Sequence, residues 1–289
     1  MKRCSGTLLV LAVCLATANL AYADLTIVQK TTAEGGMASA AASQMQGGMP
    51  SPTVTTRIKG LKGRMDIDMG SSNFPTNMST ITDGEAKQVI LIDHNQKTAR
   101  VSTGAPAAAP GAPVPSVQLD GSVKPTGQSQ TIDGMKCDEY LFTTTLSLSD
   151  MGGAQVPPEA AAAMQGISMV MKGSMWVAKD VPGAAEYAAY QKAMSSGDLA
   201  GAAMGATGMN LPGMEKMAKA MASVQGMPVL TEVTMNIEAG ANASEQARQM
   251  AQMMSGMGAM KVTTKVLSVK TDAIAADVFQ VPAGYQTIK

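Results

Sequence analysis

Strict alternation between apolar and polar residues is the clearest pattern in this sequence. From Val229 to Glu238 the odd positions are mostly apolar and the even positions mostly polar. Side chains of a β-strand point alternately to its two faces, so this spacing predicts a strand with one buried face and one face in water. We therefore expect a sheet of which one side packs on a core.

The alternation also predicts two hairpins. In residues 54–58 the even positions are mostly apolar, whereas in residues 65–69 the odd positions are apolar. The change falls at Gly60–Gly63, and a tight turn there lets both strands face one core. A second hairpin is expected from a strand at 89–93, a turn at 94–97 and a strand at 98–102.

Five further segments are expected to be strands. They are residues 25–32, 117–119, 137–147, 168–179 and 261–270. Strands that follow one another at short spacing favour an antiparallel sheet over alternating strand–helix–strand units.

Three segments have the spacing of helices, at residues 182–195, 215–224 and 242–257. In the first, Tyr187, Tyr190 and Met194 recur at intervals of three and four residues, which puts them on one side of a helix. In the last, Ser244 is a candidate N-cap and Glu245 adds a negative charge to the first turn. The predicted fold class is α+β.

The first residues have the form of a signal peptide. The basic pair Lys2-Arg3 precedes an apolar segment, Thr7–Leu20, that is too short to span a bilayer comfortably. Ala21-Tyr22-Ala23 then provides a cleavage site of the small-x-small type. We expect residues 1–23 to be removed and the mature protein to be periplasmic or secreted.

A competing interpretation makes Cys14 a lipidated cysteine, but Val13 stands where a small residue normally precedes such a cysteine. No later segment has the pattern of a membrane span, because the best candidate, Leu199–Met209, is short and rich in Gly. Once the signal is removed, Cys137 is the remaining cysteine and has no partner for an internal disulfide. We expect it to be a small buried side chain.

Low-complexity segments interrupt the strands near residues 34–52, 103–115 and 152–163. They consist mainly of Ala, Gly, Pro, Ser and Met, without the patterned hydrophobicity of a separate core. We therefore expect residues 24–289 to form a single domain in which these segments are loops.

Charge and motif content exclude several classes of function. The chain has 22 Lys and Arg against 22 Asp and Glu, whereas a nucleic-acid-binding protein shows a basic surplus or stripe. One His and three Cys offer little material for a zinc site. The sequence contains no motif of a serine hydrolase, a zinc protease or a phosphate-binding loop. We expect a non-enzymatic protein without a metal or cofactor.

The polar residues in and between the predicted strands give little indication of a catalytic site. His94 lies between two predicted strands beside Asn95, so we expect it to be an exposed turn residue. Asp66 and Asp68 share one face of a strand, which allows a paired acid and base. Because Arg64 lies on the same face, a solvated and charge-balanced surface is the preferred interpretation.

Methionine is unusually frequent, at 26 of 289 residues, and three interpretations stay open. Met is a flexible filler for a core with few aromatic residues. The same flexibility suits an adaptable apolar pocket for lipid-like ligands. Thioethers also bind Cu(I), and the densest candidates for such a site are Met250, Met253, Met254, Met257 and Met260.

Seven short segments carry a family resemblance: Arg57–Met65, Val89–Asp93, Lys97-Thr98, Gly134–Cys137, Met175–Ala178, Asp180–Gly183 and Val278–Tyr285. Together they resemble a family of exported bacterial proteins, a domain of unknown function (number forty-four-twelve) that is related to the outer-membrane lipoprotein carrier fold. The resemblance implies a curved antiparallel sheet, an incomplete barrel, with helices on its concave side. In carriers of that fold the hollow holds acyl chains, whereas the family itself has no established reaction.

These observations lead us to expect an exported protein that binds or shields a hydrophobic, lipid-like ligand in a Met-rich hollow. An envelope structural or interaction protein with a filled core, or Cu(I) binding through the methionines, is the alternative. The residues expected to line the hollow are Met65, Met69, Met169, Met171, Met175, Trp176, Met235 and Met254.

Overall fold

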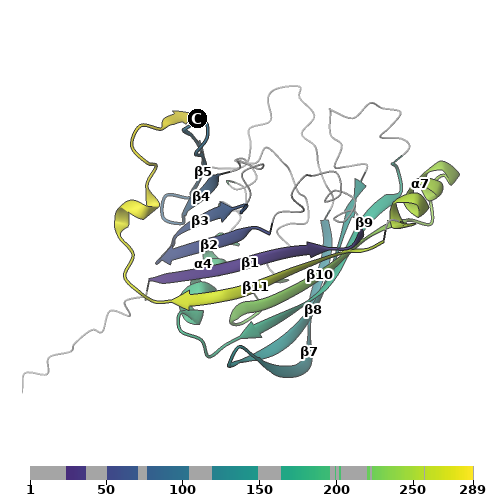
Figure 1. Ribbon diagram of the computed structural model, residues 1–289, viewed down its shortest axis with the longest axis horizontal. Coiled ribbons are helices and arrows are strands. Elements are labelled where there is room, and N and C mark those ends of the chain that lie inside the picture. The colour runs from purple at the N-terminus through teal and green to yellow at the C-terminus, as the bar shows by residue number, and fades with distance from the viewer. Residues whose placement is uncertain are drawn as a thin grey trace, which may run out of the picture.

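Twelve strands of the described chain form one sheet, in the order β12-β6-β5-β4-β3-β2-β1-β11-β10-β9-β8-β7 (Figure 1). The computed structural model describes residues 24–36, 51–70, 77–103, 119–148, 164–195, 199, 202, 220–221, 223–256 and 258–288. The elements are β1 (Leu25–Glu34), β2 (Thr53–Lys59), β3 (Lys62–Asp68), β4 (Met78–Asp83), β5 (Gln88–Asp93), β6 (Thr98–Ser102), β7 (Leu119–Ile132), β8 (Met135–Ser147), β9 (Ile167–Ala178), α4 (Ala184–Met194), β10 (Met227–Ala239), α7 (Glu245–Gly256), β11 (Met260–Lys270), the 3-10 turn η2 (Ala276–Phe279) and β12 (Gln286–Ile288).

The sheet consists of two runs of consecutive strands. β1 to β6 form one antiparallel run and β7 to β11 form the other, and the antiparallel pairing of β1 with β11 joins them. Among the described strands only β12 pairs in parallel, with β6. The prediction of a mainly antiparallel sheet is confirmed, and the sheet is open, with β12 and β7 at its edges.

Both predicted hairpins form. β2 and β3 pair so that Thr56 lies opposite Met65 and Val54 opposite Ile67, which puts the even positions of β2 on the same face as the odd positions of β3. Gly60 supplies the turn with a φ of 58°, a conformation that suits glycine. β5 and β6 form the second hairpin, close to the predicted bounds.

Three strands escaped prediction in whole or in large part: β4, β7 and β12. The predicted segment 117–119 only touches the start of β7, which has little apolar alternation. Pro125 interrupts β7, and the pairing register with β8 shifts between Pro125 and Ser129. Proline cannot donate to a strand ladder, so it is tolerated here because β7 is an edge strand.

Strand pairing puts methionines from both halves on one face of the sheet. Ile27 and Thr31 lie on the same face of β1, since strand alternation has a period of two. Cross-strand partners share a face of the sheet, so the pairs can be followed from strand to strand. One series is Ile27–Thr56–Met65, from β1 to β3, and the other is Thr31–Thr264–Thr231–Met175, from β1 to β9. The face they define, called the methionine face below, carries Met65, Met169, Met171, Met175, Met235 and Met260.

The two predicted helices that the structure describes pack in different places. α4 shares a core with β1 and β2, in which Leu25, Ile58 and Tyr190 are buried. α7 packs its Ala247 and Ala251 on Ile167 and Ile237, at the ends of β9 and β10. Most of the predicted helix 215–224, the signal segment, nearly all of the three loops and Met257 lie outside the described residues.

The predicted start of α7 is confirmed by its capping bonds. The Ala247 backbone N–H donates to Ser244 Oγ at 3.1 Å, which satisfies one of the free donors at a helix start. Glu245 lies in the first turn, where its charge complements the helix dipole.

Candidate functional site

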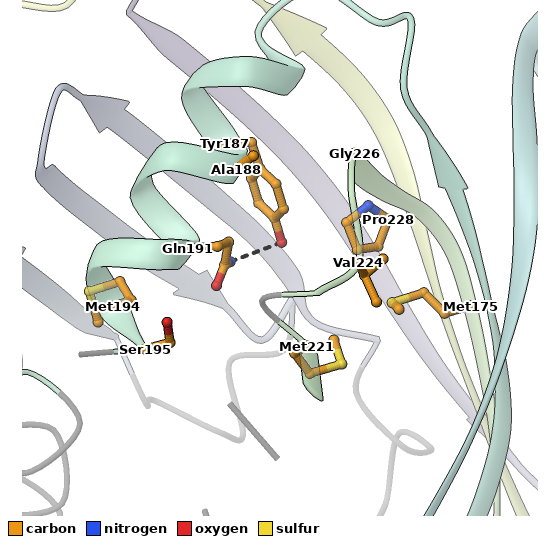
Figure 2. Close-up of a pocket in the computed structure, with 10 residues that line it drawn as sticks. All are labelled: Met175, Tyr187, Ala188, Gln191, Met194, Ser195, Met221, Val224, Gly226 and Pro228. Carbon is orange, nitrogen blue, oxygen red and sulfur yellow. Dashed lines mark hydrogen bonds between the residues drawn. The ribbon is translucent and has the colours of Figure 1, made fainter. Parts of the chain in front are cut away.

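A cavity of about 180 Å³ lies between α4 and the neighbouring strands β9 and β10 (Figure 2). Helix α4 contributes four residues, β9 contributes Met175, and the segment that leads into β10 supplies most of the rest. The lining consists of Met175, Tyr187, Ala188, Gln191, Met194, Ser195, Met221, Val224, Gly226 and Pro228. None of these side chains carries a charge, so the cavity suits a neutral, apolar group.

The polar groups of this cavity partly satisfy one another. The Gln191 Nε2 amide donates to the Tyr187 hydroxyl at 2.9 Å, as the dashed line in Figure 2 shows. Burial raises the pKa of Tyr187 above its ordinary value, although the bond from Gln191 works in the opposite direction. Tyr187 is therefore neutral at physiological pH and adds no charge to the lining.

Two glycines allow α4 to approach the sheet. Gly183 precedes the helix with a φ of 81°, and a Cβ atom there would clash with the Leu25 side chain. Gly63 of β3 leaves room for Tyr190, whose ring and hydroxyl would collide with a Cβ atom at position 63. Tyr190 crosses this gap and its hydroxyl bonds to Thr82 Oγ1 at 2.5 Å. The helix is thereby fixed on the methionine face.

A second and smaller cavity, of about 40 Å³, lies where α7 meets β9, β10 and β11. Four methionines surround it, and the remaining lining residues are small, amide or aliphatic. The complete lining is Met169, Met235, Asn236, Ile237, Met254, Ser255, Gly258 and Met260.

The structure divides the predicted lining residues among several places. Met175 lines the larger cavity, and three others, Met169, Met235 and Met254, line the smaller one. Met65 and Met171 share the methionine face, and Met65 is 37% exposed. Met69 is half-buried just after β3. The expectation of one hollow lined by all eight residues is wrong, because the two cavities lie at different ends of β9 and β10.

Trp176 requires a separate correction. It follows Met175 along β9 and pairs with Leu230 and Glu139. Strand alternation therefore points it to the opposite face from Met175. Trp176 does not share the methionine face, and the prediction that it lines the same hollow as these methionines is wrong.

Sequence reasoning missed several residues of the larger cavity. Tyr187 and Met194 lie at helical spacing, but nothing in the sequence indicates that the helix borders a cavity. Val224, Gly226 and Pro228 reach the site from a segment without periodicity. Only the tertiary arrangement brings this segment beside α4.

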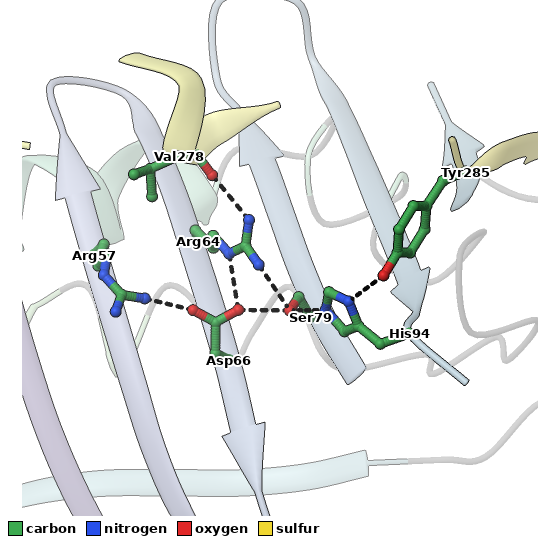
Figure 3. A network of polar contacts seen from close by, with 7 residues as sticks. All are labelled: Arg57, Arg64, Asp66, Ser79, His94, Val278 and Tyr285. Atoms are coloured by element: carbon green, nitrogen blue, oxygen red, sulfur yellow. Dashed lines mark hydrogen bonds and ion pairs between the residues drawn. The ribbon is translucent and has the colours of Figure 1, made fainter. Parts of the chain in front are cut away.

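A network of polar side chains lies on the opposite face from the methionines (Figure 3). Asp66 accepts hydrogen bonds and ion pairs from Arg57 and Arg64, and Arg64 Nη1 donates to the Val278 carbonyl at 3.0 Å. Burial would raise the pKa of Asp66, but the bonds from Ser79 and Arg64 and the charges of both arginines hold it below its ordinary value. The expected charge balance around Asp66 exists, in a half-buried setting.

His94 is not the exposed turn residue that we expected. It is half-buried, its Nε2 lies 2.7 Å from Ser79 Oγ, and its Nδ1 lies 2.8 Å from the Tyr285 hydroxyl. The C-terminal segment thus covers this part of the sheet, and Tyr285 packs beside the buried residues Ile81, Ile90, Ile92 and Ala99. No sequence pattern indicated that residues so far apart along the chain meet here.

The Ser79–His94 pair resembles part of a hydrolase triad, but its hydrogen bonds run in the opposite direction. Ser79 donates its single hydrogen to Asp66 Oδ1 at 2.5 Å, so His94 Nε2 must donate to Ser79. A nucleophilic serine instead gives its proton to the histidine. Ser79 is also only 2% exposed. The geometry suits a structural role, in which these hydrogen bonds hold the C-terminal segment on the sheet.

Cys137 is buried and unpaired, as expected. Burial raises the pKa of its thiol, which weakens it as a nucleophile. Within the described part of the chain, no three His, Cys, Asp or Glu residues gather closely enough to hold a metal ion. No helix in that part is long and apolar enough to cross a membrane.

Comparisons with known proteins show distant similarities of structure. An uncharacterized conserved protein from Thermus thermophilus aligns at 8% identity with a TM-score of 0.39, over 93% of this chain and 91% of that one. PNGF-II aligns in two crystal forms at 9% identity, with TM-scores of 0.35 and 0.36 over 92% of this chain. The alignment spans only 30 to 31% of PNGF-II. Neither similarity is close enough to bear on function.

No protein with a curated description matches the sequence. The relation to the lipoprotein carrier fold stays a prediction. The family resemblance itself is confirmed over part of the chain, because residues 34–154 match the family model described as Domain of unknown function (DUF4412).

Proposed function

We propose that the protein, after export, binds or shields a hydrophobic, lipid-like molecule without transforming it. The observation that carries this proposal is the cavity beside α4, which is bordered by ten uncharged residues. Ligand pockets are mostly apolar and have a few polar groups that fix orientation. Here Gln191 and Ser195 supply such groups at the C-terminal end of the helix.

The size of the cavity limits what enters it. A volume of about 180 Å³ is close to the roughly 150 Å³ cavity that holds benzene in an engineered protein. Pockets that enclose a whole drug-sized ligand measure about 300–1,000 Å³. The cavity therefore suits one end of an acyl chain, and the rest of the chain would lie along the methionine face.

The packing of α4 also supports a proposal about the shape of the sheet. We place α4 on the concave side of a curved sheet, as in the carriers that the family resembles. In support, Leu25, Gly63 and Tyr190 bring α4 onto the methionine face. Met227 and Val229 are almost completely buried in the same core as Ala184 and Tyr190 of α4, so we place the ligand beside α4 and not beneath it.

Binding of a fluorescent fatty acid tests the proposal. Ala188 is an exposed residue of α4 that lines the cavity, and Ala188→Trp would fill it with little strain on the core. Ala185→Trp is the matched control, because Ala185 is exposed on the same helix but does not line this cavity. We expect Ala188→Trp to weaken binding about tenfold or more, a loss of roughly 1.4 kcal/mol. Ala185→Trp should bind as the unchanged protein does.

Either of two results would count against the proposal. One is an unchanged protein that takes up no fatty acid and leaves the cell without any lipid in native mass spectrometry. The other is an Ala188→Trp variant that folds normally and binds as tightly as the Ala185→Trp control.

A further inference from the structure

Four methionines from four different elements line the smaller cavity. Met169 comes from β9, Met235 from β10, Met260 from β11 and Met254 from α7. All four side chains are half-buried. The four residues are therefore packed in the fold without being sealed from solvent.

Strand register fixes three of the four methionines. Met235 and Met260 are direct cross-strand partners, a relation that puts Cβ atoms about 4.5–5.5 Å apart. Met169 pairs with Ile237, two positions along β10 from Met235, and so lies diagonally opposite on the same face. These side chains thus form a cluster before any helix covers them.

Helix α7 adds the fourth methionine. Its Ala247 and Ala251 are buried against Ile167 and Ile237, which holds the helix at the ends of β9 and β10. Met254 follows Ala251 by three residues and Ala247 by seven, so it faces the same strands. Met253, by contrast, is 70% exposed on the outer side of the helix.

The donor atoms of the cavity select for a particular kind of ion. Thioether sulfur is a soft, uncharged ligand that suits Cu(I), whereas Ca²⁺ and Mg²⁺ require oxygen ligands, largely from carboxylates. Among the described residues that line the cavity, none is a carboxylate, an imidazole or a thiol. Asn236 and Ser255 offer only neutral polar groups.

The size of the cavity separates an ion from a larger ligand. A volume of about 40 Å³ exceeds the roughly 10–15 Å³ that one water molecule needs. It is far below the roughly 300 Å³ at which pockets for drug-sized molecules begin. The cavity therefore has room for one ion and at most a small co-ligand.

We propose that Met169, Met235, Met254 and Met260 form a binding site for a soft monovalent metal ion, Cu(I). The site shares only two residues, Met254 and Met260, with the methionine cluster that the sequence indicates. It is separate from the cavity beside α4 and does not depend on lipid binding. No electron transfer is implied, because the ion enters and leaves as Cu(I).

Competition for Cu(I) against a colorimetric chelator, in the presence of a reductant and without oxygen, tests the site. We expect the purified protein to remove one equivalent of Cu(I) from the chelator. Met235→Leu and Met254→Leu should each weaken binding about tenfold or more, since even outer partners of metal ligands cause losses of 10–100-fold. Leucine keeps the apolar volume, so the fold should persist. Met253→Leu, on the exposed side of α7, is the matched control and should bind as the unchanged protein does.

A second measurement identifies the ligands directly. In protein labelled with ¹³C at the methionine methyl groups, Ag(I) serves as a redox-inert probe for Cu(I). The resonances of Met169, Met235, Met254 and Met260 should shift together at one equivalent, and that of Met253 should not. The proposal is overturned if the protein removes no Cu(I), if Met253→Leu weakens binding as much as Met254→Leu, or if Ag(I) shifts methionines throughout the chain at once. The fatty-acid test uses Ala188, which does not line the smaller cavity, so the two proposals are tested by separate variants.

Discussion

The two halves of the sheet are built from different side chains and covered in different ways. In β4 and β5, neighbouring residues that point to opposite faces, such as Val89 and Ile90, are both buried. One face of this half packs near Leu199 and Ala202, and the other packs under Val281 and Tyr285. In β9 and β10 most side chains are only half-buried, and methionines outnumber isoleucines.

This difference separates a rigid part of the molecule from an adaptable one. β-Branched isoleucines have few rotamers and pack with defined geometry, whereas methionine has three rotatable bonds and fills irregular space. The cavity beside α4 and the smaller cavity beside α7 lie in the methionine-rich half. The isoleucine-rich half thus serves as a scaffold, and the other half carries the sites where ligands are proposed.

The largest effect is expected from a cavity made in the scaffold half. Ile92 is completely buried, so Ile92→Ala should lower the free energy of unfolding by about 2–5 kcal/mol. Met171→Ala, in the half-buried methionine face, should cost clearly less. Urea unfolding followed by circular dichroism measures both. Equal losses would remove the distinction between the two halves.

Loss of the Asp66 carboxylate should have the next largest effect. Asp66→Asn removes the negative charge that pairs with Arg57 and Arg64, and we expect a loss of about 1–3 kcal/mol at neutral pH. Because the pKa of Asp66 is lowered in the folded protein, its contribution is complete above the ordinary pKa of aspartate, about 3.9. It disappears as the pH falls through the lowered value.

Unfolding measured from pH 7 down to pH 2 checks this sign. The unchanged protein should lose stability on acidification more steeply than Asp66→Asn. Asp68→Asn is the control, because Asp68 is exposed and its carboxylate accepts a local hydrogen bond from the Gly70 N–H. A parallel pH dependence in Asp66→Asn and the unchanged protein would contradict the assignment.

A smaller effect is expected at the start of α7, in the adaptable half. Ser244→Ala removes the capping hydroxyl from the Ala247 N–H and should cost about 1 kcal/mol. Amide hydrogen exchange should accelerate in the first turn of α7 more than in β5. If exchange increases equally in both, α7 is not an independently opening element.

The smallest effect is expected at the hydroxyl of Tyr190. Tyr190→Phe breaks the bond to Thr82 Oγ1, but Thr82 keeps a bond to the Gly63 carbonyl at 3.3 Å. We expect a loss of about 0.5–1.5 kcal/mol in thermal or urea unfolding, with the ring still packed over Gly63. Gly63→Ala, which forces the ring away, should be more harmful than Tyr190→Phe. The opposite order would show that Tyr190 does not position α4 through this gap.

Much of the fold was predictable because strand register follows from residue parity. The switch at Gly60 was sufficient to predict the β2–β3 hairpin and which of its residues share a face. The strands β4 and β7 were missed, because neither has a clear apolar alternation. The buried Ser79 and Thr82 of β4 are polar, and β7 is mostly exposed.

The candidate sites were harder to predict than the strands. The sequence indicated which methionines share a face, but not which of them border a cavity. That depends on where α4 and α7 pack, and Gly63 and Gly183 decide this for α4 through the absence of a Cβ atom. The hydrogen bond between His94 and Tyr285 could not be predicted either, because it depends on the path of the C-terminal segment.

The length and regularity of the two edge strands affect whether other chains can add strands to this sheet. An open sheet exposes unpaired backbone groups along its rims, and these recruit strands from other chains in aggregation and swapping. Here one rim ends in a three-residue strand, β12, and the other is broken at Pro125. Neither rim offers a long, flat template for fibre growth, so recognition is left to side chains on the broad surfaces.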